Sequence, residues 1–180
     1  LCGSRRAEQH MKNWWQKLIK EYFWDCYYMW IKICNDVISL IPEEGSSPES
    51  LDMLAQAYAY RATFYLDLAR LFEPKENDYI DVSNILGLTV PIITENTKES
   101  EATNNPRAER EDMYAFILSD LGKAAQYIDP LATSYDRITI HAVDGLFARA
   151  YLEMGAAGDE GAYDKASVVV ASAAKNKRKI

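Results

Sequence analysis

Four tryptophans are the residues of this sequence best suited to chemistry at a surface. Trp14, Trp15, Trp24 and Trp30 all lie in one stretch near the N-terminus of a chain of 180 residues, of which 12% are aromatic. An indole ring can pack on the C–H face of a pyranose while nearby polar groups hydrogen-bond the sugar hydroxyls. The cluster therefore fits either a sugar-binding surface or a hydrophobic core.

The helical register separates these two interpretations. Between residues 14 and 41 the apolar residues recur at steps of three and four, which predicts a helix that carries Trp24 and Trp30 mainly in its core face. Trp14 and Trp15 lie at the start of that helix, and two adjacent helical residues cannot both face one core. One of the two is expected to be exposed. Trp14 and Trp15 are therefore the candidate ligand-binding residues.

No arrangement of side chains typical of a catalytic site accompanies them. The two histidines, His10 and His141, belong to no metal or triad motif, and the glycines form no phosphate-binding loop. The acidic pairs Glu43-Glu44 and Glu111-Asp112 would suit glycoside hydrolysis only at a set separation across a bond. Near helix boundaries such pairs are typical of solvated caps. We therefore predict a protein that is not an enzyme and that uses no cofactor and no metal.

Composition excludes further classes of function. Twenty basic residues against twenty-seven acidic ones give a net charge of -7, which repels a phosphate backbone, so nucleic acid is not an expected partner. Cys2, Cys26 and Cys34 show no C-x-x-C spacing, which argues against a disulfide framework or a zinc site. No apolar run reaches the ~18 residues of a membrane span.

The same periodicity predicts an all-α fold. Five helices are expected, over residues 14–41, 47–72, 109–128, 139–155 and 163–175. Ser47 is the expected N-cap of the second helix, Pro48 its first residue, and Gly155 a left-handed C-cap. The last two helices resemble a tetratricopeptide pair. Between Pro74 and Pro106 the pattern dissolves into a long ordered loop excursion, and loops of this length are typically functional.

Several charged residues fall on otherwise apolar helices. Arg61, Asp67 and Arg70 share the second helix, and a buried charge needs a partner. Asp67 and Arg70 are three residues apart, so we expect them to form a salt bridge. Arg149 is expected to be paired in a similar way, and Asp120 to connect to another helix.

Five segments follow one another in the order of a known family's motifs. They are Trp24-x-x-x-Tyr28-x-x-Ile31-x-x-x-Asn35, Ala57-Tyr58-Ala59-Tyr60-Arg61-Ala62, Gly87-Leu88-Thr89-Val90-Pro91, Met113-Tyr114-x-x-Ile117-x-x-Asp120-Leu121 and Ala142 to Gly155. Together they resemble the N-terminal part of SusD/RagB proteins. The resemblance implies a surface-exposed lipoprotein of the Gram-negative outer membrane, which captures glycans and delivers them to a SusC-like TonB-dependent transporter.

The resemblance also carries expectations about the extent of the chain. Family members are typically more than twice this length, so residues 1–180 are expected to be a single SusD-like N-terminal helical region of a longer protein. Cys2 is preceded only by Leu1 and lacks the small residue usual before a lipidated cysteine. Membrane contact is therefore expected only through a lipid anchor that is not evident in this chain. The alternative is a tetratricopeptide-like scaffold for protein partners without direct sugar binding.

Overall fold

The computed structural model describes residues 2–133 and 136–176, and within these ranges it leaves the side chains of residues 2–13, 15, 16, 19, 175 and 176 undescribed. The described residues form helices and no named strand. The helices are α1 (Cys2–Leu40), α2 (Pro48–Phe72), α3 (Glu99–Ala102), α4 (Arg110–Tyr127), α5 (Ile140–Ala156) and α6 (Glu160–Asn176). No helix in the described part is both long and apolar enough to cross a bilayer.

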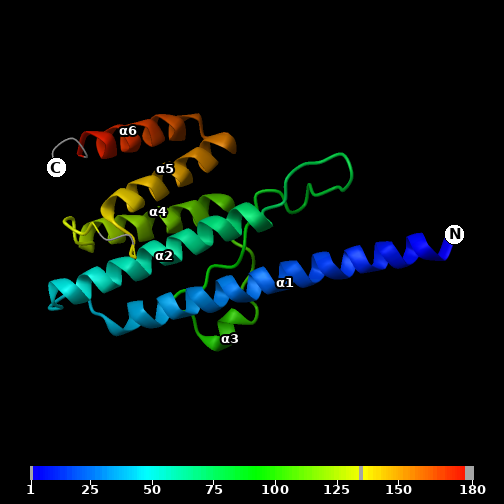
Figure 1. Ribbon diagram of the computed structural model, residues 1–180, viewed down its shortest axis with the longest axis horizontal. Helices are drawn as coiled ribbons and strands as arrows, with labels where there is room; N and C mark the ends of the chain where they lie inside the picture. Colours follow the sequence, from blue (N-terminus) through cyan, green and yellow to red (C-terminus); the bar gives the residue numbers. More distant parts are fainter. Residues whose placement is uncertain (1, 134–135, 177–180) are drawn as a thin grey trace.

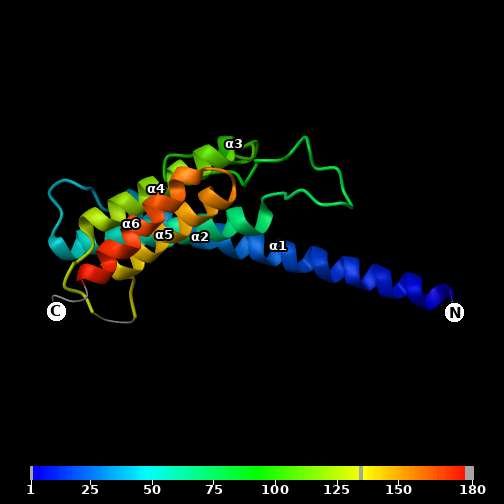
Figure 2. The same ribbon diagram turned by 90° about the horizontal axis from the view of Figure 1, so that it is seen from above.

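The long helices are stacked in chain order. Helix α1 packs on α2, α2 on α4, α4 on α5 and α5 on α6. Each runs antiparallel to the one before it, and the N-terminal half of α1 projects well beyond the other helices (Figure 1). Seen from above, α3 and the crossover before it lie on one side of this array (Figure 2). The predicted all-α fold with tetratricopeptide-like helix pairs is confirmed.

The sequence of helix α2 explains both where the helix begins and how closely its neighbours pack on it. Ser47 is its N-cap, with the side-chain oxygen accepting a hydrogen bond from the Ser50 amide at 3.2 Å, and Pro48 is the first helical residue. On its buried faces Ala59 and Ala62 are almost fully inaccessible. Small residues at these positions let α1 and α4 approach α2 closely, because the distance between packed helices depends on the side chains at the contact.

The expected role of Gly155 was wrong. Helix α5 continues to Ala156, and the left-handed residue that follows it is Gly158, with φ of 113°. Gly155 is buried, and a Cβ atom at this position would lie 2.7 Å from the ring of Tyr163 on α6. Glycine at position 155 therefore serves the packing of α5 on α6. The first and last helices also begin earlier than expected, at Cys2 and Glu160.

The crossover between α2 and α4, residues 73–109, is ordered at its centre by buried hydroxyl groups. The Tyr65 hydroxyl donates to the carbonyl oxygen of Ile93 at 2.9 Å and accepts from the amide of the same residue at 2.7 Å. The Tyr28 hydroxyl donates to the carbonyl oxygen of Pro91 at 2.7 Å. These bonds replace the β-ladder that an extended segment would otherwise need, so the crossover is held on the helices.

Tyr65→Phe should therefore destabilise the protein without changing its packing. The ring stays buried, but the Ile93 amide loses its hydrogen-bond partner, which costs about 1–3 kcal/mol for a buried group. Urea unfolding measures the loss, and Tyr60→Phe, with a ring 39% exposed on the same helix, is the control. Equal unfolding free energies for the two variants would contradict the assigned role of Tyr65.

Candidate functional site

Trp14 lies on the part of α1 that projects beyond the other helices, and its side chain is 58% exposed. The side chain of Trp15 lies outside the described part of the chain. Their role as ligand-binding residues stays a prediction.

The other two tryptophans have different surroundings. Trp24 is half-buried against Tyr28 and Phe72, with ring centroids 4.9 and 5.1 Å away, so its expected core position is confirmed. Trp30 is 39% exposed, and its expected core position was wrong. Six residues along an α-helix turn the side chain about 120° away from the starting direction. Because α1 is covered on one side only, Trp24 and Trp30 cannot both face the core.

Trp30 belongs to a line of three rings that crosses from α1 to α2. Its centroid lies 5.3 Å from that of Phe64, with 37° between the ring planes, and Phe64 lies 6.1 Å from Tyr60 at 23°. Tyr60 is also 39% exposed, while Phe64 is half-buried. Tyr27 stands edge-on to both Trp30 and Phe64, at 5.4 and 5.9 Å. We refer to Trp30, Phe64 and Tyr60 as the aromatic row.

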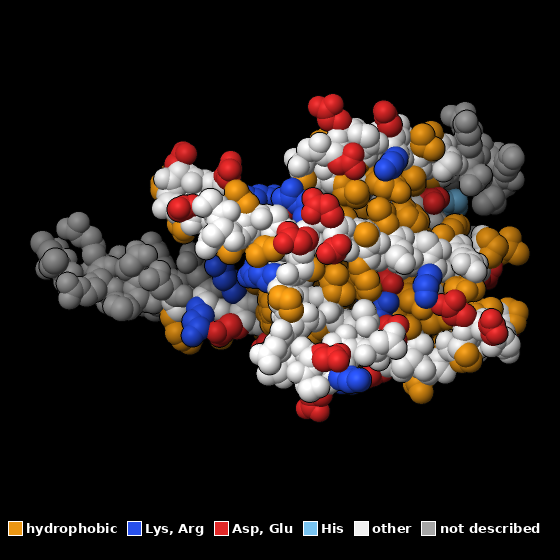
Figure 3. All heavy atoms as spheres, turned by 180° about the vertical axis from the view of Figure 1, so that it is seen from behind, with side chains coloured by type: hydrophobic (Ala, Val, Ile, Leu, Met, Phe, Trp, Pro, Cys, Tyr) orange, Lys and Arg blue, Asp and Glu red, His pale blue; other side chains and the backbone are white. Residues whose placement is uncertain are grey.

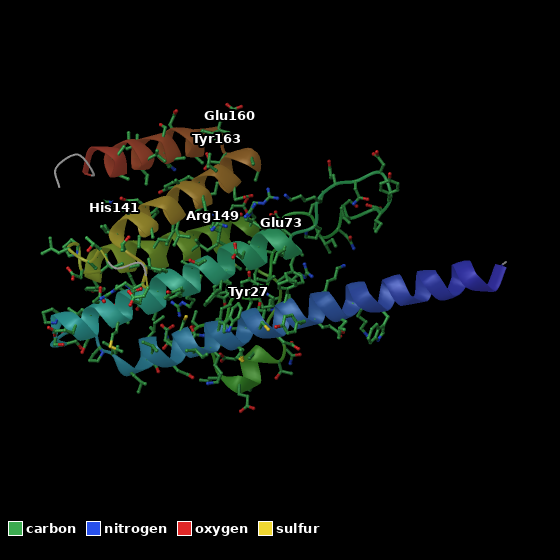
Figure 4. The ribbon with its side chains drawn as sticks, in the orientation of Figure 1. Tyr27, Glu73, His141, Arg149, Glu160 and Tyr163 are labelled. Carbon is green, nitrogen blue, oxygen red and sulfur yellow. The ribbon has the colours of Figure 1, made fainter. Side chains whose placement is uncertain are left out.

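A polar pair adjoins the aromatic row. The Tyr27 hydroxyl donates to Asp67 Oδ2 at 3.3 Å, and Arg149 Nη2 donates to Asp67 Oδ1 at 3.0 Å. The side chains of Asp67 and Arg149 are 28% and 43% exposed. Tyr60, Phe64 and Asp67 are four and three residues apart, so they share one face of α2. Tyr27 and Arg149 lie on either side of that helix (Figure 4).

The expected salt bridge between Asp67 and Arg70 was wrong. Asp67 pairs with Arg149, and Arg70 Nε pairs with Glu153 Oε1 at 2.6 Å. Both partners lie on α5. The two charges are therefore used to join α2 to α5, a choice that the spacing within α2 could not reveal. Burial, followed by the charge and hydrogen bond of Asp67, raises the pKa of Tyr27, so this hydroxyl stays protonated at neutral pH.

A neighbouring face of α2, about a quarter turn away, carries a buried charge network around Arg61. The guanidinium is bidentate to Asp120, with Nε to Oδ2 at 2.7 Å and Nη2 to Oδ1 at 2.8 Å. Its Nη1 donates to Asn35 Oδ1 at 2.7 Å and to Glu95 Oε2 at 2.6 Å. The network joins α1, α2, α4 and the crossover, so the expected link from Asp120 to another helix is confirmed.

A groove of about 360 Å³ lies over this network, between α1 and the crossover. Asn35 and Glu95 line it, together with Lys32, Thr94 and Thr97. Asn35 is already satisfied, because its Nδ2 donates to the Ile93 carbonyl and its Oδ1 accepts from Arg61. Among the described residues no group of histidine, cysteine and carboxylate side chains could hold a metal ion. The side chain of Asn35 at this groove is therefore used to hold the crossover on α1.

A family model described as starch-binding and associating with the outer membrane matches residues 4–152. The chain belongs to the SusD-like family. The segments by which the sequence resembles this family include Asn35, Arg61 and Asp120, which form the buried network, and Tyr28, which holds the crossover. The family motifs of this SusD-like chain thus belong to its scaffold. Of the three residues in the aromatic row, Tyr60 lies within a family motif, whereas Trp30 and Phe64 do not.

Solved structures with the same fold agree with this assignment. A SusD superfamily protein from Bacteroides thetaiotaomicron is 28% identical over 82% of this chain, with a TM-score of 0.62. A SusD-like carbohydrate-binding protein from Bacteroides vulgatus is 25% identical over 83%, with a TM-score of 0.64. A laminarin-binding SusD-like protein is 21% identical over 80%, with a TM-score of 0.60, and shows the fold alone.

The SusD-like chain spans only part of these proteins. It covers 31% of the length of the first two and 28% of the third. No curated protein sequence matches it.

Asp120→Ala should strongly destabilise this SusD-like chain. Arg61, with only 3% of its side chain exposed, would keep its buried charge but lose its bidentate partner. Breaking a buried pair in this way costs about 3–5 kcal/mol, whereas an apolar replacement of both partners is often close to neutral. Urea unfolding should therefore show partial recovery in the triple variant Arg61→Met, Asp120→Leu, Glu95→Gln, in which no charge of the network is left without its partner. A triple variant no more stable than Asp120→Ala would contradict this account.

Glu95→Gln should change how stability depends on pH. Burial alone raises the pKa of Glu95, but the hydrogen bond and charge of Arg61 outweigh it and hold the pKa below its ordinary value. Such a carboxylate stabilises the fold above the unfolded pKa of about 4.3, and its contribution is lost as pH falls through the folded pKa.

We therefore expect the variant to be less stable than the wild type at pH 7, and the difference to shrink at acidic pH. The urea unfolding midpoints of the variant and the wild type, measured at pH 7 and at acidic pH, check this. The control is Glu76→Gln, at an exposed position of the crossover. A difference in stability that does not change with pH would show that the charge of Glu95 does not stabilise the fold.

Proposed function

We propose that this chain is the N-terminal helical region of a longer protein that binds oligosaccharides or polysaccharides at the cell surface. The observation that carries the proposal is the family match over residues 4–152, whose description is starch-binding. The SusD-like carbohydrate-binding protein from Bacteroides vulgatus, which is 25% identical to this chain, supports the same ligand class. The protein binds glycans without cleaving them, and it uses no cofactor.

The delivery step and the location form part of the same proposal. The family description includes association with the outer membrane, which supports a surface-exposed lipoprotein held there by a lipid anchor. A binding protein of this kind captures glycan and passes it to a SusC-like TonB-dependent transporter, its protein partner. We include Trp14 and Trp15 as ligand-binding residues, supported by the 58% exposure of the Trp14 side chain.

Electrophoresis of the chain in native gels containing starch or laminarin tests glycan binding. We expect migration to be retarded relative to a gel without polysaccharide, and the double variant Trp14→Ala, Trp15→Ala to be retarded less. Tyr79→Ala, which removes a ring 92% exposed on the crossover, is the matched control. Migration unchanged by either polysaccharide would contradict glycan binding by this chain.

A second candidate is a tetratricopeptide-like scaffold that binds a protein and no sugar. On the face seen in Figure 3, hydrophobic side chains gather in the spaces between the helices and acidic side chains stand around them. Exposed apolar surface of this kind is typical of protein interaction sites. Capture of the purified transporter by the immobilised chain, with no retardation in the polysaccharide gels, would favour the scaffold.

A further inference from the structure

The outward side of α1 carries a line of apolar side chains. Tyr22, Met29, Ile33 and Leu40 are between 53% and 77% exposed, and Cys26 lies half-buried among them. Steps of three, four or seven residues separate consecutive members, so all five lie on one side of the helix. We refer to these five residues as the outer stripe.

The outer stripe faces away from the rest of the chain. Ile31 is buried in the core, and Met29 and Ile33 each lie two residues from it. Two residues turn an α-helix by about 200°, so the stripe is opposite to the core face. Among the described helices only α2 packs on α1. The stripe is therefore uncovered, and exposed apolar surface of this kind is typical of interaction sites.

The spacing of the outer stripe is that of a coiled coil. Alternating steps of four and three residues repeat about every 3.5 residues, which keeps one side of a helix turned toward a partner helix. The repeat includes one polar residue, Asp36, whose carboxylate is paired with Lys32 at 2.7 Å. From Tyr22 to Leu40 the stripe extends about 27 Å along the helix axis. It therefore fits a second long helix with an apolar stripe of its own.

The two edges of the stripe indicate which helix fits and in which direction. One edge carries Asp25 and Lys32, which are opposite in charge and seven residues apart. The other edge carries Phe23 and Trp30, which are 43% and 39% exposed. When two identical helices pack antiparallel, each edge meets the same edge of the other copy. Asp25 of one copy then meets Lys32 of the other twice over, and apolar edge meets apolar edge.

A parallel pair lacks this match. The edge with Asp25 and Lys32 would then lie against the edge with Phe23 and Trp30, which leaves the charges beside apolar rings. Residues at these edge positions set partner choice and orientation in coiled coils. The charges and the apolar residues of α1 thus both favour a second copy of α1 in the antiparallel direction.

We propose that the outer stripe of α1 is the interface between two copies of this chain, packed antiparallel. Tyr22 of each copy packs on Ile33 of the other, and Cys26 packs on Met29. The N-terminal half of α1 projects beyond the helices of its own chain (Figure 1), and in the dimer it lies along the C-terminal half of the other α1. The interface is independent of glycan binding.

Sedimentation equilibrium of the chain over a range of concentrations tests the proposal. We expect a mass that approaches twice the monomer mass of 20.5 kDa. Ile33→Lys should raise the dissociation constant of the dimer at least about ten-fold, equivalent to about 1.4 kcal/mol, because it places a charge in the apolar interface. The matched control is Leu71→Lys, which replaces a side chain 58% exposed on α2 and should dimerise as the wild type does.

An exchange of charges tests the antiparallel direction. Lys32→Asp should weaken the dimer, because it places two carboxylates side by side. The double variant Asp25→Lys, Lys32→Asp should restore the affinity, since each pair is present again with its charges exchanged. Both variants lack the contact of Lys32 with Asp36, so that loss cancels in the comparison. Circular dichroism shows whether each variant keeps its helices.

Every other result overturns the inference. A chain that stays monomeric at millimolar concentration has no such interface, and a dimer unaffected by Ile33→Lys uses another face. Failure of the double variant to restore the affinity excludes the antiparallel direction. If the chain is monomeric and Ile33→Lys abolishes its capture by the purified transporter, or its co-sedimentation with phosphatidylglycerol vesicles, the stripe belongs to that partner. Retardation in the polysaccharide gels reports on the proposed function separately.

Discussion

The buried charge of Arg61 is the constraint on which the rest of the arrangement depends. A guanidinium with 3% of its side chain exposed must be surrounded by acceptors, and no single helix can supply them. Asn35, Asp120 and Glu95 come from α1, α4 and the crossover. All four segments therefore have to be in register at the same time. A slip of α4 by one turn would remove the bidentate partner Asp120, and a slip of α1 would remove the acceptor Asn35, so the network favours a single packing of the helices around α2.

Adjacent residues on α2 show how the scaffold and the exposed surface are kept separate. Arg61 faces the network, while Tyr60 beside it faces solvent, because successive helical residues differ in direction by about 100°. The buried face carries the family motifs and the hydrogen bonds that hold the crossover. The exposed face carries the aromatic row and Asp67. A substitution of the exposed Tyr60 therefore leaves the buried contacts of Arg61 in place.

The sequence correctly predicted those features of the fold that depend on neighbouring residues or on family motifs. Ser47 and Pro48 begin α2 as predicted, because capping depends only on nearby residues. It failed where the outcome depends on what covers a helix. Trp30 is exposed because none of the described helices covers that side of α1, and Asp67 pairs across to Arg149 because α5 lies beside α2. The aromatic row was missed for the same reason, since it joins rings from two helices and its only sequence signal is the spacing of Tyr60 and Phe64.

The projection of α1 beyond the other helices separates its two exposed tryptophans. Trp14 and Trp30 lie on one continuous helix, about 24 Å apart along its axis at a rise of about 1.5 Å per residue. Sixteen residues also turn an α-helix by about 160° beyond whole turns, so the two side chains leave α1 on nearly opposite sides. A rigid, flat partner can therefore contact one of these rings but not both.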